Sequence, residues 1–453
     1  MEPKLEKKYG LFTAIAMVVG IVIGSGVFFK AEKILTATGG NLKQGILAWV
    51  IGGVIMISCA YTFSVMATKY QYVNGIVDYA EATVGKKYAY YVGWFMAVIY
   101  YPTITSVLAW VSARYTCVIF GFSITGGECM TIACLYLVSS FTINALSPVL
   151  AGKFQVTTTV IKLIPLFLMA VVGTFTGLRS GMTAYNFTHY VSQGTSNGLF
   201  TAVVAACFAY EGWIIATCIN AELKNAKRNL PLALITGTFI TMSAYILYYI
   251  GLAGTIKNEV IMAGGEAGAK LAFQTVFTSA GGSLLFVFVI ISCLGTLNGL
   301  MLGCTRGIYS IAARGLGPKP QVFSQVDPTT NMPVNSAILG LFLCGIWLFY
   351  FYGANLTDTW FGFFSFDSSE LPIVTVYALY IPIFIRFMIK GKELNFFNRI
   401  FMPCLSLAGS LFMIVAAWFA HGMAVIAFLI VAFAVMGLGA LLLLKSKQPV
   451  NEI

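Results

Sequence analysis

Two short stretches inside long apolar segments combine helix-weakening residues with polar groups that can bind a ligand. Gly-Ser-Gly at 24–26 interrupts the first apolar segment, and glycine inside a helix costs roughly 1 kcal/mol relative to alanine. Tyr-Glu-Gly at 210–212 stands halfway along another segment. An acid at membrane depth is tolerated mainly where it faces a partner or a wet cavity. We therefore expect both helices to unwind at these residues.

Local unwinding would expose main-chain groups that a continuous helix keeps paired. N–H groups at the positive end of a half-helix bind a carboxylate, and freed carbonyls bind an ammonium group. In lipid this is tolerable only around a cavity, and a zwitterion such as an amino acid presents both groups. The alternative for the first stretch is close helix packing, because Gly20 and Gly24 fit the small-xxx-small pattern. The matching interruption in the second helix favours binding.

The elements that must position these residues are membrane helices. Of the 453 residues, 59% are hydrophobic and 9% are charged, whereas soluble domains carry about a quarter charged residues. The chain is therefore expected to be an all-α polytopic membrane protein forming one domain over 1–453. Twelve apolar segments are long enough to span a bilayer; they lie near 10–36, 44–67, 89–118, 128–147, 154–177, 197–220, 231–255, 281–305, 333–352, 359–385, 400–420 and 422–444.

The distribution of Lys and Arg predicts the orientation of the helices. With the N-terminus inside, nineteen Lys and Arg residues fall on the inner side and six on the outer side, where Lys30 and Lys33 are counted. Both termini are therefore expected to be cytoplasmic, as an even number of spans requires. The net charge of +11 does not indicate nucleic-acid binding, because the basic residues lie between spans. We also expect an amphipathic stretch at the cytoplasmic surface in the inner loop 69–88, and a short helix in the outer loop 256–280.

A few ionisable residues lie within the predicted spans. Lys162 stands eight residues after Phe154, roughly 12 Å along a helix, so its ammonium group either reaches the cytoplasmic surface or has a partner inside. Asp367 and Glu370 are three residues apart, which would place them on one helix face. They line a polar cavity or outer vestibule, or form a proton or side-chain recognition site. Arg114 is expected to be an interfacial anchor.

The sequence offers no catalytic or metal-binding constellation. The ten cysteines form no CxxC pair and are read as small buried hydrophobes. The two histidines, His189 and His421, both lie near predicted loops. No HExxH motif and no His/Asp/Ser grouping is present. We therefore predict no enzyme activity, no metal and no cofactor.

Several motifs, in order, resemble those of one transporter family. "VVGIVIGSGVFF" (18–29) and "FAYEGW" (208–213) look like the amino acid–polyamine–organocation (APC) superfamily. The resemblance is closest to its L-amino acid transporter (LAT) branch, including bacterial serine/threonine-type and alanine/serine/cysteine-type exchangers. Supporting stretches lie at 162–167, 226–234 and 294–320, and the resemblance covers residues 9 to about 405.

The resemblance implies a fold and a mode of action. It implies a LeuT-like five-plus-five inverted repeat with discontinuous helices 1 and 6. The first repeat would span 9–178, the second 197–390, and two extra helices would follow at 400–444. Such proteins work by alternating access, usually as obligatory one-for-one exchangers of amino acids.

The resemblance also implies roles for particular residues. Phe208 matches an aromatic residue that covers the substrate, and Lys162 stands where sodium-coupled relatives bind sodium, which argues against sodium coupling and leaves proton linkage open. Glu211 is a residue that tunes the site, and Gly212 leaves room for backbone movement. The backbone that would hold the substrate carboxylate is that of Ile23, Gly24, Ser25, Gly26 and Val27. The carbonyls that would hold the amino group are those near Ala206, Cys207, Phe208, Ala209 and Tyr210.

The preferred expectation is sodium-independent exchange of small neutral L-amino acids across the plasma membrane. Proton-coupled symport, or exchange of cationic or larger neutral amino acids, stays open as an alternative. Eukaryotic LAT relatives join a glycoprotein through a cysteine after span 3. Cys117 and Cys129 flank that loop here, but the local sequence does not match, so we expect no disulfide-linked heavy chain and a monomer in the lipid bilayer. The inner loop departs at "VNGIVDY" (73–79) from the family pattern of a cytoplasmic gate.

Overall fold

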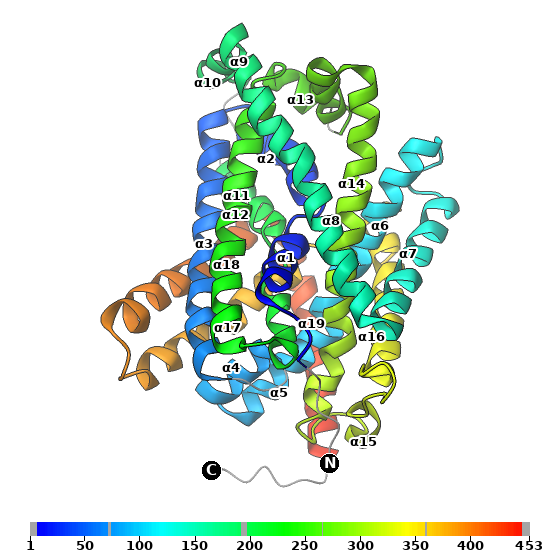
Figure 1. The fold of residues 1–453 in the computed structure, drawn as a ribbon, viewed down its shortest axis with the longest axis vertical. Coiled ribbons are helices and arrows are strands. Elements are labelled where there is room, and N and C mark those ends of the chain that lie inside the picture. Colours follow the sequence, from blue (N-terminus) through cyan, green and yellow to red (C-terminus); the bar gives the residue numbers. More distant parts are fainter. Residues whose placement is uncertain (1–6, 71–73, 192–196, 265, 358–359, 446–453) are drawn as a thin grey trace.

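The computed structural model describes residues 7–70, 74–191, 197–264, 266–357 and 360–445. Within these residues the chain is helical, and its long helices run roughly along the vertical axis of Figure 1. The one extended contact among them is an isolated parallel bridge between Tyr9 and Leu223.

The first half of the chain contains eleven α-helices and two π-helical turns among the described residues. They are α1 (Leu11–Val22), α2 (Gly26–Ala37), α3 (Leu42–Lys69), α4 (Gly75–Thr83), α5 (Lys86–Phe95), η1 (Met96–Tyr100), α6 (Tyr101–Phe120), α7 (Gly127–Leu146), α8 (Pro148–Leu168), η2 (Met169–Gly173), α9 (Thr174–Ser180), α10 (Met182–Thr188) and α11 (Gly198–Ala209).

The second half begins with a 3₁₀ helix and ends with two long apolar helices. Its elements are η3 (Trp213–Glu222), α12 (Ala226–Ala253), α13 (Asn258–Gly264), α14 (Glu266–Ala312), α15 (Pro320–Phe323), α16 (Val334–Phe351), η4 (Tyr352–Leu356), η5 (Gly362–Phe364), α17 (Leu371–Lys390), η6 (Phe397–Phe401), α18 (Met402–His421) and α19 (Ala424–Lys445).

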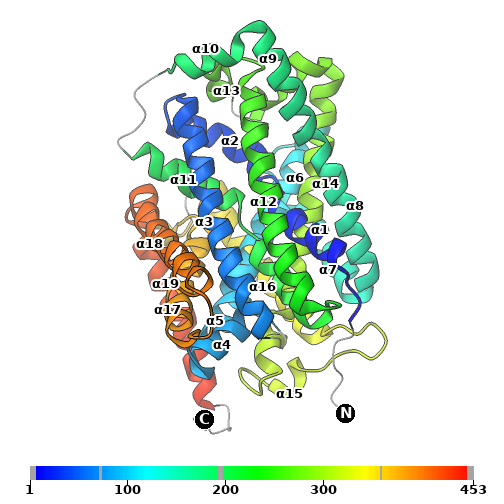
Figure 2. The same ribbon diagram turned by 60° about the vertical axis from the view of Figure 1, so that its left-hand side comes forward.

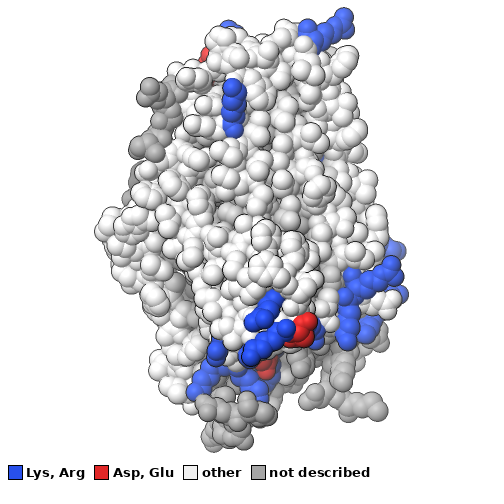
Figure 3. Space-filling model, turned by 90° about the vertical axis from the view of Figure 1, so that its left-hand side faces the viewer, with Lys and Arg blue, Asp and Glu red and all other residues white. Residues whose placement is uncertain are grey.

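Twelve helices in the described part of the chain are long and apolar enough to cross a membrane, which confirms the predicted number. The described ends of the chain point to the same end of the molecule, called the terminal end below (Figure 2). Helices α9, α10 and α13 lie at the opposite end. On the face drawn in Figure 3, Lys and Arg side chains gather mainly near the terminal end.

Three predicted segments differ from the structure. The tenth span begins at Leu371 instead of 359, because residues 360–370 form turns and a short 3₁₀ helix. Asp367 therefore does not share a helix face with Glu370, and its carboxylate instead accepts main-chain N–H groups within the turn. In the loop 69–88, α4 is largely buried and not a surface helix, because it packs between η3, α5 and α17. Residues 71–73 lie outside the described part of the chain.

The loop 256–280 contains the expected short helix, α13. The following helix α14 starts earlier than predicted, at Glu266, and has non-helical backbone at Phe277 and Thr278. The core around the broken helices is formed by four long elements. Helix α1 packs against α8, α12 and α14, and α2 packs against α11.

Candidate functional site

The first span is broken where the sequence predicts. Helix α1 ends at Val22, where Ile23 N–H still bonds to Val19 O at 2.8 Å, and Gly24 N–H turns back to Val22 O at 2.9 Å. Helix α2 starts again at Gly26. The first N–H groups of a new helix have no partner within it, so the start of α2 presents main-chain donors at the break.

The carbonyls at the end of α1 are bound by side chains from two neighbouring helices. Lys162 Nζ, fully buried on α8, donates to Gly20 O at 2.7 Å and to Ile23 O at 2.6 Å. Thr296 of α14 donates to the same two carbonyls, each at 2.9 Å. Lys162 therefore does not reach the surface; its charge is held between α1, α8 and α14.

The sixth span is broken at the second predicted stretch. Helix α11 ends at Ala209, and Gly212 has a φ of 108°, a left-handed conformation that glycine adopts at little cost. The chain continues as η3, a 3₁₀ helix of ten residues, longer than the three or four residues that are usual and therefore typical of a hinge. The two breaks meet directly, because a Cβ atom at Gly26 would lie 2.7 Å from Ala209 Cα.

Tyr245 of α12 joins the two breaks and was missed by the sequence reasoning. Its hydroxyl lies 3.0 Å from Val22 O and 3.1 Å from Ala209 O. A hydroxyl has one proton to donate, so it serves both carbonyls by sharing that proton. Stacking on Tyr210, with ring centroids 5.1 Å apart, fixes its position. A tyrosine in an apolar span carries no sequence signal that singles it out.

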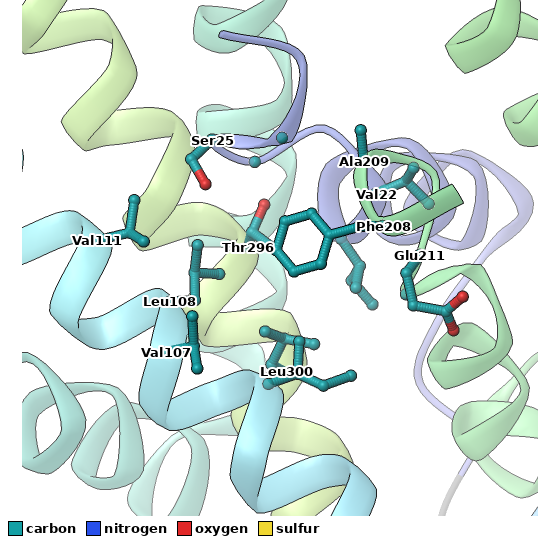
Figure 4. A pocket seen from close by; sticks show the side chains of 15 residues that line it. Val22, Ser25, Val107, Leu108, Val111, Phe208, Ala209, Glu211, Thr296 and Leu300 are labelled. Carbon is teal, nitrogen blue, oxygen red and sulfur yellow. The ribbon is translucent and has the colours of Figure 1, made fainter. Parts of the chain in front are cut away.

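A pocket lies beside the two breaks, and Figure 4 shows its side chains. The ring of Phe208 projects into its middle, and the carboxylate of Glu211 points away from that ring. Helix α6 supplies an apolar wall opposite the breaks. The lining comprises Ile21, Val22, Gly24, Ser25, Gly26, Ile104, Val107, Leu108, Val111, Phe208, Ala209, Glu211, Gly212, Thr296 and Leu300.

Seven of the twelve residues expected around the substrate line this pocket: Gly24, Ser25, Gly26, Phe208, Ala209, Glu211 and Gly212. Ile23 and Val27 are buried but do not line it. The side chains of Ala206, Cys207 and Tyr210 pack against Gly52 of α3 instead. The wall residues of α6 were not predicted, because apolar residues in an apolar span give no signal of their own.

Glu211 is hydrogen-bonded to the third membrane span. Tyr100 of η1 donates its hydroxyl to Glu211 Oε1. The other carboxylate oxygen, Oε2, is buried and makes no hydrogen bond to any described residue. No Lys, Arg or His among the described residues forms a salt bridge with this carboxylate.

A cluster of charged side chains, called the outer cluster below, lies next to Phe208 on the side of α2. It consists of Lys30 and Lys33 of α2, Glu370 before α17 and His421 at the end of α18. Lys30, counted above on the outer side, is 2% exposed and pairs with Glu370. Lys33 and His421 reach the same carboxylate at 3.0 and 2.9 Å. The Lys30 ammonium also lies 4.2 Å from the centre of the Phe208 ring, a cation–π contact.

Charged groups also join the helices at the terminal end. Arg306 of α14, fully buried rather than in a loop, donates from Nε to Glu222 Oε1 at 2.8 Å. Lys8 lies 3.2 Å from Glu222 Oε2. Arg314 pairs with Asp78 of α4 and donates to Glu81 at 2.7 Å. The pocket is thus flanked by ion pairs in both directions along the long axis.

The other residues singled out from the sequence lie away from this pocket. Arg114 stacks on Trp110, with its guanidinium carbon 5.3 Å from the ring centre. None of the ten cysteines, all of which lie in the described part of the chain, forms a disulfide, and eight of them are buried. Among the described residues, no group of three or more His, Cys, Asp or Glu side chains is arranged to hold a metal ion.

This geometry suits a small zwitterion. Main-chain donors at the start of α2 lie next to carbonyls at the ends of α1 and α11, so a carboxylate and an ammonium group can bind side by side. The aliphatic wall of α6 and Leu300 leaves an apolar space for a side chain. Phe208, held by Lys30, lies between this space and the outer cluster.

Comparison with known proteins places the chain among transporters. A family model described as amino acid permease matches residues 9–441. The chain is 29% identical over 418 residues to the serine/threonine exchanger SteT of Bacillus subtilis, covering 90% of this chain and 91% of that protein. It is 26% identical over 380 residues to the human b(0,+)-type amino acid transporter 1, covering 77% of this chain and 75% of that one.

A third relative is the glutamate/serine transporter AimA of Bacillus subtilis, 24% identical over 374 residues, which cover 77% of this chain and 67% of that protein. These proteins differ in the amino acids that their names give. The family match spans all of the residues that build the two breaks and the pocket. The chain belongs to the amino acid permease family of the APC superfamily and is an amino acid transporter.

Proposed function

We propose that this protein exchanges small neutral L-amino acids across the plasma membrane, by alternating access and without sodium. The observation that carries the proposal is the meeting of two helix breaks at one pocket with an apolar side wall. The α-carboxylate would bind main-chain N–H groups at 24–27, and the α-ammonium group would bind carbonyls near 206–210. The relative SteT, named a serine/threonine exchanger, supports exchange of substrates of this size.

The sodium independence is supported by Lys162. Its ammonium group binds the carbonyls of Gly20 and Ile23 and the hydroxyl of Thr296, all within 3.1 Å. Carbonyl and hydroxyl oxygens are also the ligands that a hard cation uses. A positive charge fixed at this position takes the place that a transported cation would need.

The proposal includes the arrangement in the membrane. The terminal end faces the cytoplasm, in keeping with the excess of Lys and Arg predicted there. Discontinuous spans 1 and 6 would open the two halves of a five-plus-five inverted repeat, with 9–178 and 197–390 as its members. The protein would work as a monomer without a disulfide-linked heavy chain.

Counterflow in liposomes tests the function. Purified protein is reconstituted with unlabelled alanine inside, and uptake of labelled alanine, serine, threonine or arginine is followed with and without sodium. We expect uptake of the small neutral amino acids only when amino acid is present inside, and at equal rates in sodium and in choline. Preferred uptake of arginine, or dependence on sodium, would contradict the proposal.

A competition experiment tests whether the protein recognises both the carboxylate and the ammonium group of its substrate. Lactate lacks the ammonium group, and alaninamide lacks the carboxylate. Because each would leave one set of main-chain groups unpaired, we expect each to compete with labelled alanine at least 100-fold more weakly than alanine does. Competition by either compound at concentrations similar to those of alanine would exclude the two-break site.

One observation favours a second candidate, proton-coupled symport. Glu211 is buried at the break of span 6, with one carboxylate oxygen unpaired and no salt-bridge partner in the described chain. A buried carboxyl without a cation is costly when ionised. Symport predicts accumulation driven by an inward proton gradient into liposomes without internal amino acid, and loss of this accumulation in Glu211→Gln. Exchange predicts no uptake under that condition.

A further inference from the structure

The turn between α17 and α18 carries an excess of positive charge at the terminal end. Residues 385–401, called the basic turn below, comprise the end of α17, the following loop and η6. The acid among them, Glu393, already pairs with Lys69 of α3. The four basic residues form no salt bridge with any described residue, and they are Arg386, Lys390, Lys392 and Arg399. This hairpin, orange in Figure 1, lies on the side that Figure 3 faces.

Apolar side chains lie beside these charges. Ile385 and Ile389 stand on α17 at the spacing that places them next to Arg386 on one exposed face. Aromatic side chains at the end of a membrane span lie at the level of the lipid headgroups, and three are exposed here, namely Phe396, Phe397 and Phe401. The basic turn therefore presents positive charge and apolar surface together.

The guanidinium group of Arg399 is held in place by the end of α17. Its Nε donates to Met388 O at 2.9 Å, and Cys404 of α18 lies 3.5 Å from the sulfur of the same methionine. The Arg399 side chain is half-buried, and its two terminal nitrogens donate to no atom of the described residues. A planar guanidinium group with terminal N–H groups unused suits the oxygens of a phosphate.

A second cation of the basic turn is also anchored. Lys390 Nζ donates to Ala82 O of α4 at 3.1 Å, which leaves two of its three protons for another acceptor. Because Arg399 and Lys390 are already positioned by the main chain, they lose less side-chain freedom when they bind a ligand.

We propose that the basic turn binds an anionic phospholipid, with the phosphate on the guanidinium group of Arg399 and the acyl chains along Ile385 and Phe401. A lipid with a net negative charge fits better than a zwitterionic one, because the four basic side chains would repel the ammonium group of the latter. A soluble phosphate ester would leave the apolar side chains without a partner. The inference goes beyond the proposed function and holds for any transported amino acid.

Native mass spectrometry of the full chain in detergent tests the binding. Dioleoyl phosphatidylglycerol and dioleoyl phosphatidylcholine share their acyl chains and differ in net charge. Each is titrated separately, and the fraction of protein that carries lipid gives an apparent Kd. We expect phosphatidylglycerol to bind at least about 20-fold more tightly, because each basic residue near the headgroups adds roughly five-fold to the affinity for an anionic lipid.

Paired substitutions test the place of binding. Arg386→Gln with Lys392→Gln removes two charges whose side chains make no hydrogen bond to any described residue, and it should weaken phosphatidylglycerol binding about ten-fold or more. The matched control is Lys227→Gln with Arg228→Gln, which removes the same charge from exposed positions at the start of α12. The control should bind within two-fold of the unchanged protein. Melting temperatures measured without lipid show that both variants are folded.

Three results would overturn the inference. Equal binding of the two lipids, or equal losses in the two paired variants, would show that binding does not depend on the basic turn. Displacement of phosphatidylglycerol by millimolar glycerol 3-phosphate would make the turn a site for soluble phosphate. Dimers that form without lipid and disappear in Arg386→Gln with Lys392→Gln would assign this surface to a second copy of the chain.

Discussion

Among the charged residues, Lys162 contributes most to the arrangement of the first break. Its ammonium group binds two carbonyls that α1 leaves unpaired, and each buried carbonyl without a partner costs about 1–3 kcal/mol. We expect Lys162→Met to lower the alanine exchange rate at least ten-fold. The exposed Lys153 on the same helix is the matched control, and Lys153→Met should exchange normally. Exchange by Lys162→Met within two-fold of the unchanged protein would show that this charge is dispensable.

The hydroxyl of Tyr245 offers a finer test at the same scale. Removing it from the carbonyls of Val22 and Ala209 deletes one shared hydrogen bond, a loss of about 0.5–1.5 kcal/mol. Tyr245→Phe should therefore raise the KM for alanine about two- to ten-fold, measured by initial rates of exchange. Tyr248 on the same helix is equally buried, but its hydroxyl makes no hydrogen bond within the described residues. Tyr248→Phe should leave the KM unchanged, and equal effects of the two substitutions would contradict the role given to Tyr245.

At the residue scale, the sequence predicts what local composition determines. Glycines beside a serine or a glutamate mark the two breaks, and a lone lysine in an apolar span marks a buried partner. Tyr245 and the wall residues of α6 resemble any other residues of a membrane helix, so only the packed structure identifies them. Glu370 was noticed, but its pairing with Lys30 joins residues 340 positions apart and leaves no local signal.

At the scale of whole elements, the outer cluster links α2, α17 and α18 through the carboxylate of Glu370. In Glu370→Gln, Lys30 would remain buried without its counter-charge, and breaking a buried pair costs about 3–5 kcal/mol. We expect a clearly lower melting temperature in detergent. The control is Glu393→Gln, which removes an exposed partner of Lys69 and should leave the melting temperature nearly unchanged, because exposed ion pairs add little to stability.

A double variant tests whether Lys30 and Glu370 stabilise the protein through their contact with each other. Because Lys30→Met removes the charge that Glu370→Gln leaves unpaired, the combined variant should melt above the Glu370→Gln protein. Additive losses of stability in the two single variants would show that Lys30 and Glu370 do not depend on each other.

The boundaries of elements were predicted less well than their existence. Hydropathy identified all twelve spans, because each needs about 20 apolar residues. It placed the start of the tenth span too early, since residues 360–364 are apolar and aromatic but form turns. It also gave α4 a surface position, although this helix is enclosed by η3, α5 and α17.

For the molecule as a whole, the ion pairs on both sides of the pocket fit a transporter that opens one side at a time. The Glu222–Arg306 pair joins η3 to α14 at the terminal end, and the Lys30–Glu370 pair holds α2 against the start of α17. In the proposed alternating access, these contacts would break one after the other. The family match supports the overall mode of action, but the amino acid carried depends on the shape of the pocket, which no span count predicts.

The most direct test is a structure of the protein with bound alanine, determined by electron cryomicroscopy in nanodiscs. We predict the alanine carboxylate within hydrogen-bonding distance of main-chain N–H groups at 24–27, and its ammonium group on carbonyls near 206–210. The methyl group should face the α6 wall. A substrate bound elsewhere, or helices that run unbroken through Ser25 and Glu211, would contradict the account.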